Sequence, residues 1–68
     1  MMFKPGDTVI FEGYTQEAVR WGGNDEPRML MVGNTYIISE VRTHSSHTKL
    51  ILNGVVGRFN SVHFRLYQ

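Results

Sequence analysis

Apolar and polar residues alternate along this chain in several short runs, and glycine or a polar cluster follows most of them. Alternation with a period of two is typical of strands that bury one face. Runs of this kind predict strands at residues 7–12, 35–41, 48–52, 55–59 and 64–67. Five short strands favour an all-β fold in which the sheet closes as a small barrel, because closure leaves few strand edges exposed.

Local signals refine this prediction. Val41 falls out of phase within its run, and a β-bulge near Ser39 and Glu40 would return it to the core face. Asn53-Gly54 predicts a hairpin with a type I′ turn, which needs a positive φ twice. Residues 60–63 predict a single helical turn. The predicted core consists of Val9, Phe11, Tyr36, Ile38, Val41, Leu50, Leu52, Phe59, Phe64 and Leu66.

The chain has 68 residues and no cysteine. This length predicts one domain over residues 1–68, which must rely on a packed core, a closed sheet or self-association because no disulfide can form. The lack of cysteine also excludes thiolate metal sites and fits a reducing compartment. The longest apolar run, residues 29–32, is too short to span a membrane, and no signal peptide is recognisable. We therefore expect a soluble, cytoplasmic protein without a membrane partner.

Several motifs, separated along the chain, together resemble those of a known protein family. Phe3-Lys4-Pro5-Gly6-Asp7-Thr8-Val9 is followed by residues 30–38, then by Val41, Gly57-Arg58-Phe59, Phe64 and Leu66. This arrangement resembles the small SH3-like barrel proteins of bacteriophages and prophages, an uncharacterised family, over nearly the whole chain outside residues 14–28. The resemblance implies a phage origin, action in the host bacterial cytoplasm, and a long first loop of the RT type. It implies no catalytic residues.

Residues 14–28 break the alternation. Residues 15–21 could form a helical turn capped by Thr15, but Gly22-Gly23-Asn24-Asp25 follows at once, so we expect a long irregular hairpin with this tip. A strand through residues 29–32 would turn Leu30 and Val32 inward and two methionines outward. Trp21 could cover the barrel or could anchor a partner, since Trp, Tyr and Arg are enriched at binding hot spots. The predicted protein-binding residues are Tyr14, Arg20, Trp21, Arg28, Met29 and Met31.

Charge is divided unevenly between the two halves. All six acidic residues precede residue 41, whereas four of the seven lysines and arginines follow it. An acid-free basic half that also holds aromatic residues can bind a nucleic acid, because arginines hold phosphates and bases stack on rings. The predicted residues for this alternative are Arg42, Lys49, Arg58, Arg65 and Tyr67. If the two halves intermix in the fold, the charges would instead cancel locally.

Catalytic and metal-binding patterns are weak. His44 and His47 lie in a serine-rich loop and His63 lies elsewhere, whereas a zinc site needs three or four ligands. Serine and histidine neighbours occur at Ser45 and Ser61, but a triad needs a third group that no pattern supplies. A symmetric assembly with a shared pore, as in plasmid-type dihydrofolate reductases of SH3-like fold, is a third interpretation by analogy alone. The sequence predicts a non-catalytic domain without cofactor or metal that binds a protein, and the resemblance implies that this is a host protein. Nucleic-acid binding is the alternative, an enzyme formed by oligomerisation is the third interpretation, and a homo-oligomer is a possible assembly.

Overall fold

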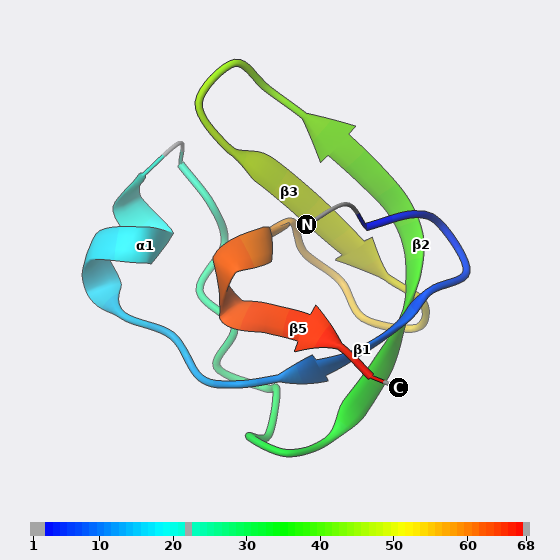
Figure 1. Cartoon of the computed structure of the whole chain (residues 1–68). Helices are drawn as coiled ribbons and strands as arrows, with labels where there is room; N and C mark the ends of the chain where they lie inside the picture. Colours follow the sequence, from blue (N-terminus) through cyan, green and yellow to red (C-terminus); the bar gives the residue numbers. More distant parts are fainter. Residues whose placement is uncertain (1–2, 22, 68) are drawn as a thin grey trace.

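The computed structural model describes residues 3–21 and 23–67, which fold mostly as β-structure (Figure 1). All-β is therefore the correct fold class. In chain order the elements are β1 (Thr8–Phe11), α1 (Gln16–Arg20), β2 (Thr35–Thr43), β3 (Thr48–Leu52), β4 (Phe59–Asn60), the 3₁₀ turn η1 (Ser61–His63) and β5 (Phe64–Leu66).

The five strands of the described residues form one antiparallel sheet in the order β4-β3-β2-β1-β5. Strands β4 and β5 are its two edges, although only η1 separates them in the chain. In a flat sheet these edges would lie about 19 Å apart, at about 4.8 Å per strand. Three residues of 3₁₀ helix rise only about 6 Å. The sheet must therefore curl until its edges approach each other, and β2 bends along its length in Figure 1.

The core lies inside this curl. Phe11 pairs with Phe64 across β1 and β5, and Leu50 pairs with Val41 and Phe59 across its two neighbouring strands. All ten predicted core residues are buried or pack against the buried cluster, so the period-two prediction is confirmed. The buried apolar residues are Val9, Phe11, Leu30, Ile38, Leu50, Leu52, Phe59 and Phe64.

A bulge in β2 keeps this strand in register with the core. Ile38 pairs with Leu52, but Glu40 pairs with Ile51, so one residue of β2 is left over between them. The shift returns Val41 to the core side, where it packs against the buried cluster. The predicted bulge and the predicted helical turn at residues 60–63, observed as η1, are both confirmed.

The first loop differs from the prediction. The irregular hairpin expected there is wrong at residues 16–20, where α1 forms with Thr15 as its N-cap. A five-residue helix is marginal on its own. It is held here by Asn60, whose side-chain amide donates to the Ala18 carbonyl at 3.0 Å from 42 residues away. Of the predicted glycine-rich tip, Gly22 lies outside the described residues.

Two further segments differ from the prediction. Residues 29–32 do not form a strand: the Leu30 N–H donates to the Pro27 carbonyl at 3.3 Å, and the Asn34 N–H donates to the Met31 carbonyl at 3.0 Å, which are the bonds of turns. Leu30 is buried as expected, but Val32 is 70% exposed. The predicted strand at residues 55–59 begins only at Phe59, since Gly57 adopts a φ of 134° that a regular strand does not contain.

The turn after β3 is of another type than predicted. Val55 donates its backbone N–H to the Leu52 carbonyl, and Gly54 has a φ of 77°. Asn53, however, has a negative φ, like every other non-glycine residue that the structure describes. A positive φ at the third position alone is the pattern of a type II turn, whereas type I′ needs two. The negative φ of Asn53 is one that alanine also adopts, so the predicted need for a left-handed residue at position 53 is wrong.

Candidate functional site

Helix α1 gives the first loop a fixed shape. Thr15 Oγ1 accepts the backbone N–H of Ala18 at 3.2 Å, as an N-cap should, and the Trp21 N–H donates to the Glu17 carbonyl at 3.0 Å. Past the helix, the buried Asn24 donates from Nδ2 to the Trp21 carbonyl. The chain on both sides of Trp21 is thus held by hydrogen bonds within the loop.

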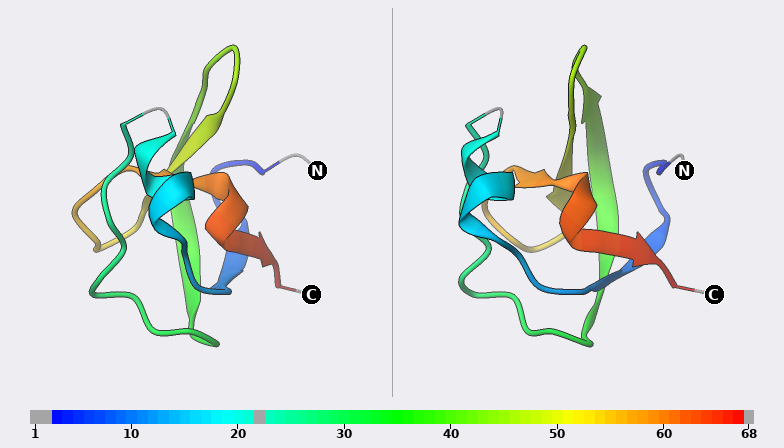
Figure 2. Two further views of the ribbon diagram at one scale, coloured as in Figure 1. Left: turned by 90° about the vertical axis from the view of Figure 1, so that its left-hand side faces the viewer. Right: turned by 60° about the vertical axis from the view of Figure 1, so that its left-hand side comes forward.

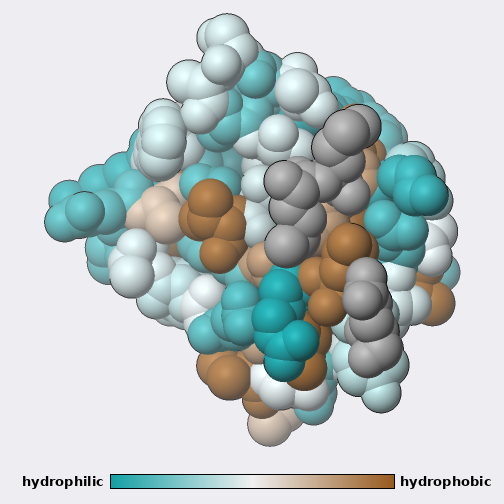
Figure 3. All heavy atoms as spheres, in the orientation of Figure 1, coloured by the Kyte–Doolittle hydropathy of each residue, from teal (hydrophilic) through white to brown (hydrophobic). Residues whose placement is uncertain are grey.

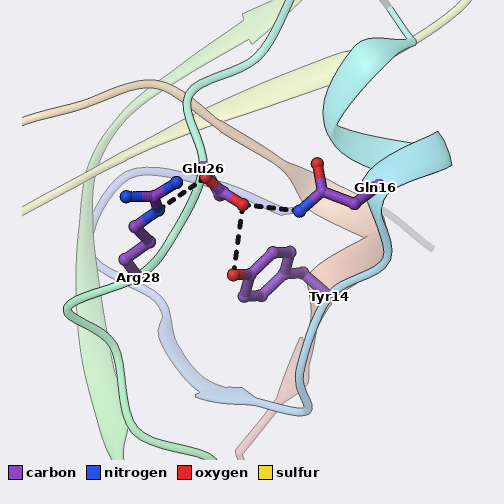
Figure 4. A network of polar contacts seen from close by, with 4 residues as sticks. All are labelled: Tyr14, Gln16, Glu26 and Arg28. Atoms are coloured by element: carbon purple, nitrogen blue, oxygen red, sulfur yellow. Dashed lines mark hydrogen bonds and ion pairs between the residues drawn. The ribbon is translucent and has the colours of Figure 1, made fainter.

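A second set of contacts closes the loop at its base (Figure 4). Glu26 accepts hydrogen bonds from Gln16 Nε2 at 2.5 Å, from Arg28 Nε at 2.6 Å and from the Tyr14 hydroxyl at 3.3 Å. The bond from Gln16, followed by that from Arg28, holds the pKa of Glu26 below its ordinary value. Two predicted site residues, Tyr14 and Arg28, therefore meet through a carboxylate that joins the two ends of the loop.

Trp21 is 55% exposed, so its side chain does not cover the core. It lies at the end of α1 beside Arg20, which is also exposed. Met29 and Met31 are each about two-thirds exposed, as predicted. In both Figures 1 and 2, however, the end of α1 and the turns at residues 28–33 lie at opposite ends of the loop. The structure therefore does not gather the six predicted protein-binding residues into one surface.

An open cleft lies between α1 and η1, which are neighbours in Figures 1 and 2. Its volume is about 400 Å³, within the range of small-ligand sites. Residues 12–15 and Ala18 form one wall, and Val62 and His63 form the other. Of these residues only Tyr14 is a predicted binding residue, because residues 12–18 and 62–63 are about fifty positions apart and share no motif.

His63 is buried in the inner wall of this cleft and packs within an aromatic cluster. Its ring meets Phe11 and Tyr14 edge to face, with centroids 6.5 and 6.0 Å away, and lies beside Phe64. Nε2 is buried without a hydrogen-bond partner among the described residues. Burial disfavours the charged imidazolium and lowers the pKa of His63, so this ring is neutral at pH 7.

The basic residues of the second half do not form a free cationic face. Arg65 Nε lies 2.9 Å from Glu12 Oε2, across β5 and β1, and Arg42 Nε lies 2.5 Å from Glu40 Oε2. Lys49 Nζ donates to the Gly23 carbonyl at 3.4 Å. Arg58 and Tyr67 are exposed. The acidic first half thus intermixes with the basic second half, which weighs against the nucleic-acid alternative.

Two histidines stack at the tip of the β2–β3 hairpin, which projects from the body of the molecule in Figure 2. The rings of His44 and His47 lie 4.7 Å apart with an angle of 19° between them. Within residues 3–21 and 23–67, no group of three potential ligands is placed to hold a metal ion. The same residues include no helix of the length and hydrophobicity that a membrane crossing requires.

The exposed apolar side chains are dispersed. Figure 3 shows apolar side chains at several separate places on the face that carries η1 and β5, with hydrophilic ones between them. Val62 is exposed on η1, Ile37 on β2 and Val56 in the loop between β3 and β4. Single exposed apolar residues are normal on a soluble surface and mark no site by themselves. The candidate site is therefore the first loop with its exposed Trp21 and the adjoining cleft.

Comparisons with protein-family models, with curated proteins and with solved structures each find no match to this chain.

Proposed function

We propose that this chain is a non-catalytic protein-binding domain that engages its partner through the first loop, with Trp21 as the anchor. The observation that carries the proposal is the exposure of the Trp21 side chain at the end of a hydrogen-bonded loop. A large aromatic residue on a preformed loop loses little conformational entropy on binding, and such residues dominate binding energies at interfaces. Loops on a rigid scaffold are also where binding residues concentrate.

The fold proposed for this domain is an SH3-like barrel. The strand order, with both sheet edges joined through η1, and the long loop after β1 support it. The family resemblance then suggests a phage-encoded protein that acts in the bacterial cytoplasm on a host protein.

The test is affinity capture from a bacterial lysate with the chain immobilised. The wild type is compared with Trp21→Ala and with Tyr67→Ala, a matched control because Tyr67 has nearly the same exposure, 57%. We expect Trp21→Ala to weaken binding of the captured protein by at least about 2 kcal/mol, so that the variant no longer retains it. Tyr67→Ala should retain it, and nuclease treatment should leave capture unchanged. Equal capture by Trp21→Ala, or loss after nuclease treatment, would contradict the proposal.

A further inference from the structure

We propose that the cleft between α1 and η1 receives an arginine side chain of the protein partner. This inference rests on the proposed function, because the cleft includes Tyr14, Thr15 and Ala18 of the same first loop. Arginine is a chemical class of ligand that the sequence pattern of the cleft residues does not indicate.

Hydrogen bonds join the two walls. Asn60 is almost wholly buried, and its side chain spans them: Oδ1 accepts the Val62 N–H at 3.2 Å, and Nδ2 donates to the Ala18 carbonyl at 3.0 Å. At the other end, the Glu12 N–H donates to the His63 carbonyl at 2.8 Å. These bonds hold the walls apart at a set width, so the site is present before any ligand arrives. A preformed site spends less binding free energy on ordering itself.

The lining suits a side chain with an apolar stem and a cationic end. Val62 and Ala18 offer aliphatic surface, and the Tyr14 ring, partly exposed, offers an aromatic face on which a guanidinium can stack. Glu12 supplies the negative charge and is the only acidic residue among those that line the cleft. The neutral, buried His63 ring closes the inner wall and adds no competing positive charge.

Glu12 already binds a guanidinium. Arg65 reaches it from β5 with Nε 2.9 Å from Oε2, and both side chains are about half exposed. An exposed pair of this kind contributes little to stability and exchanges readily with other cations. Arg65 therefore acts as an internal competitor that occupies Glu12 until the partner's arginine replaces it. The consequence is specific: removing Arg65 should strengthen binding at this cleft, the opposite of what a cationic binding surface would show.

The experiment is a titration of the ¹⁵N-labelled chain followed by two-dimensional NMR. The probe is N-acetylarginine amide. N-acetylcitrulline amide has the same length without the charge, and methylguanidinium has the charge without the stem. We expect the arginine probe to shift the amide signals of Ala18, Val62 and His63, with citrulline at least about tenfold weaker. Methylguanidinium should also bind more weakly, and an equal affinity would show a site for a free small cation and overturn the proposal.

Three variants make the test decisive. Glu12→Gln should weaken the arginine probe about tenfold, and Arg65→Gln should tighten it several-fold. If Glu12→Gln does not fold, Val62→Lys replaces it, because a lysine on the exposed Val62 position repels the probe without touching the core. Unchanged affinity in these variants, or shifts elsewhere on the molecule, would overturn the inference. If the arginine probe fails while Trp21→Ala still loses the captured protein, the proposed function stands and only the cleft assignment fails.

Discussion

Gly57 shows how closely single positions are fitted to the core. Its φ is 134°, and a Cβ added there would lie 2.7 Å from the ring of Phe59, which is buried. Gly54 also has a positive φ, but a Cβ there would meet nothing within 4 Å. The two glycines therefore separate the conformational cost of a side chain from its steric cost.

We expect Gly57→Ala to destabilise the domain by about 2–4 kcal/mol, since the strained backbone adds to the displacement of a core ring. Gly54→Ala should cost only about 1–2 kcal/mol, from the backbone alone. Urea unfolding of both variants beside the wild type measures the difference. Equal losses of unfolding free energy would mean that the Phe59 ring moves away freely and that its close approach to Gly57 does not affect stability.

His63 makes stability depend on pH. Burial lowers its pKa from the ordinary value of 6.5, so the unfolded chain takes up a proton at a higher pH than the folded chain does. Between those two pKa values the unfolded state binds more protons. Stability should therefore fall as the pH falls below 6.5, with a slope of at most about 1.4 kcal/mol per pH unit for one histidine, until the pH reaches the folded pKa.

The check is the melting temperature between pH 7.5 and 5 for the wild type and for His63→Phe, which keeps an aromatic ring among Phe11, Tyr14 and Phe64. The pKa of His47 is also lowered, first by burial and then by His44 and Lys49. The chain with His63 and the chain with His63→Phe therefore both carry His47→Gln, which removes this second titrating group. His63→Phe should flatten the profile above pH 5. A profile of the same slope would place the titrating group elsewhere.

At the scale of elements, α1 and η1 depend on one another through Asn60. Its Oδ1 caps η1 and its Nδ2 holds the Ala18 carbonyl of α1. Asn60→Ala removes both bonds and should cost about 2–3 kcal/mol, at about 1 kcal/mol for a cap and more for a buried group left unpaired. Asn60→Ser can still cap η1 but cannot reach Ala18, so its loss should be smaller. Equal losses in urea unfolding would show that the link to α1 contributes nothing.

The same pair of elements explains how far the sequence could predict this fold. Strands follow from alternation, which is local, so β1, β2, β3 and β5 and their core residues were predictable. Helix α1 was not, because five residues are marginal alone and the stabilising Asn60 lies 42 positions away. The sign of φ at Asn53 likewise depends on the strands that the turn joins.

The candidate site was predictable only in its exposed part. Trp21, Met29 and Met31 could be expected at the surface, because Trp21 precedes two glycines that cannot cover it and the two methionines flank Leu30, which is buried. The cleft could not, because Glu12 and Val62 are brought together by the pairing of β1 with β5, which sets Phe11 opposite Phe64. The Glu26 contacts with Tyr14 and Arg28 depend in the same way on how the first loop closes.

At the scale of the whole molecule, folding mixes two halves of opposite charge. The chain carries a formal net charge of +1, and Arg65 meets Glu12 across 53 positions. Binding to a nucleic acid without sequence specificity needs several cations on one face, each of which releases counterions from the phosphates. Arg42 and Arg65 each lie in an ion pair and Lys49 donates within the chain, so Arg58 is the predicted basic contact with no such bond among the described residues.

We therefore expect no stable complex with a labelled 30-nucleotide DNA or RNA, single- or double-stranded, at 50 mM salt and micromolar protein. Non-specific affinities at physiological salt are typically about 10⁻⁴–10⁻⁶ M and rise steeply at low salt, so fluorescence anisotropy at 50 mM salt would detect a true nucleic-acid face. Arg58→Ala serves as the matched variant, since it removes the unpaired cation without breaking an ion pair. Binding that weakens steeply with salt, and weakens further in Arg58→Ala, would contradict this prediction. It would support the nucleic-acid alternative over the protein-binding proposal. Arg65→Gln then separates the two: it should weaken such binding if phosphates are the ligand and strengthen binding at the cleft if a partner's arginine is.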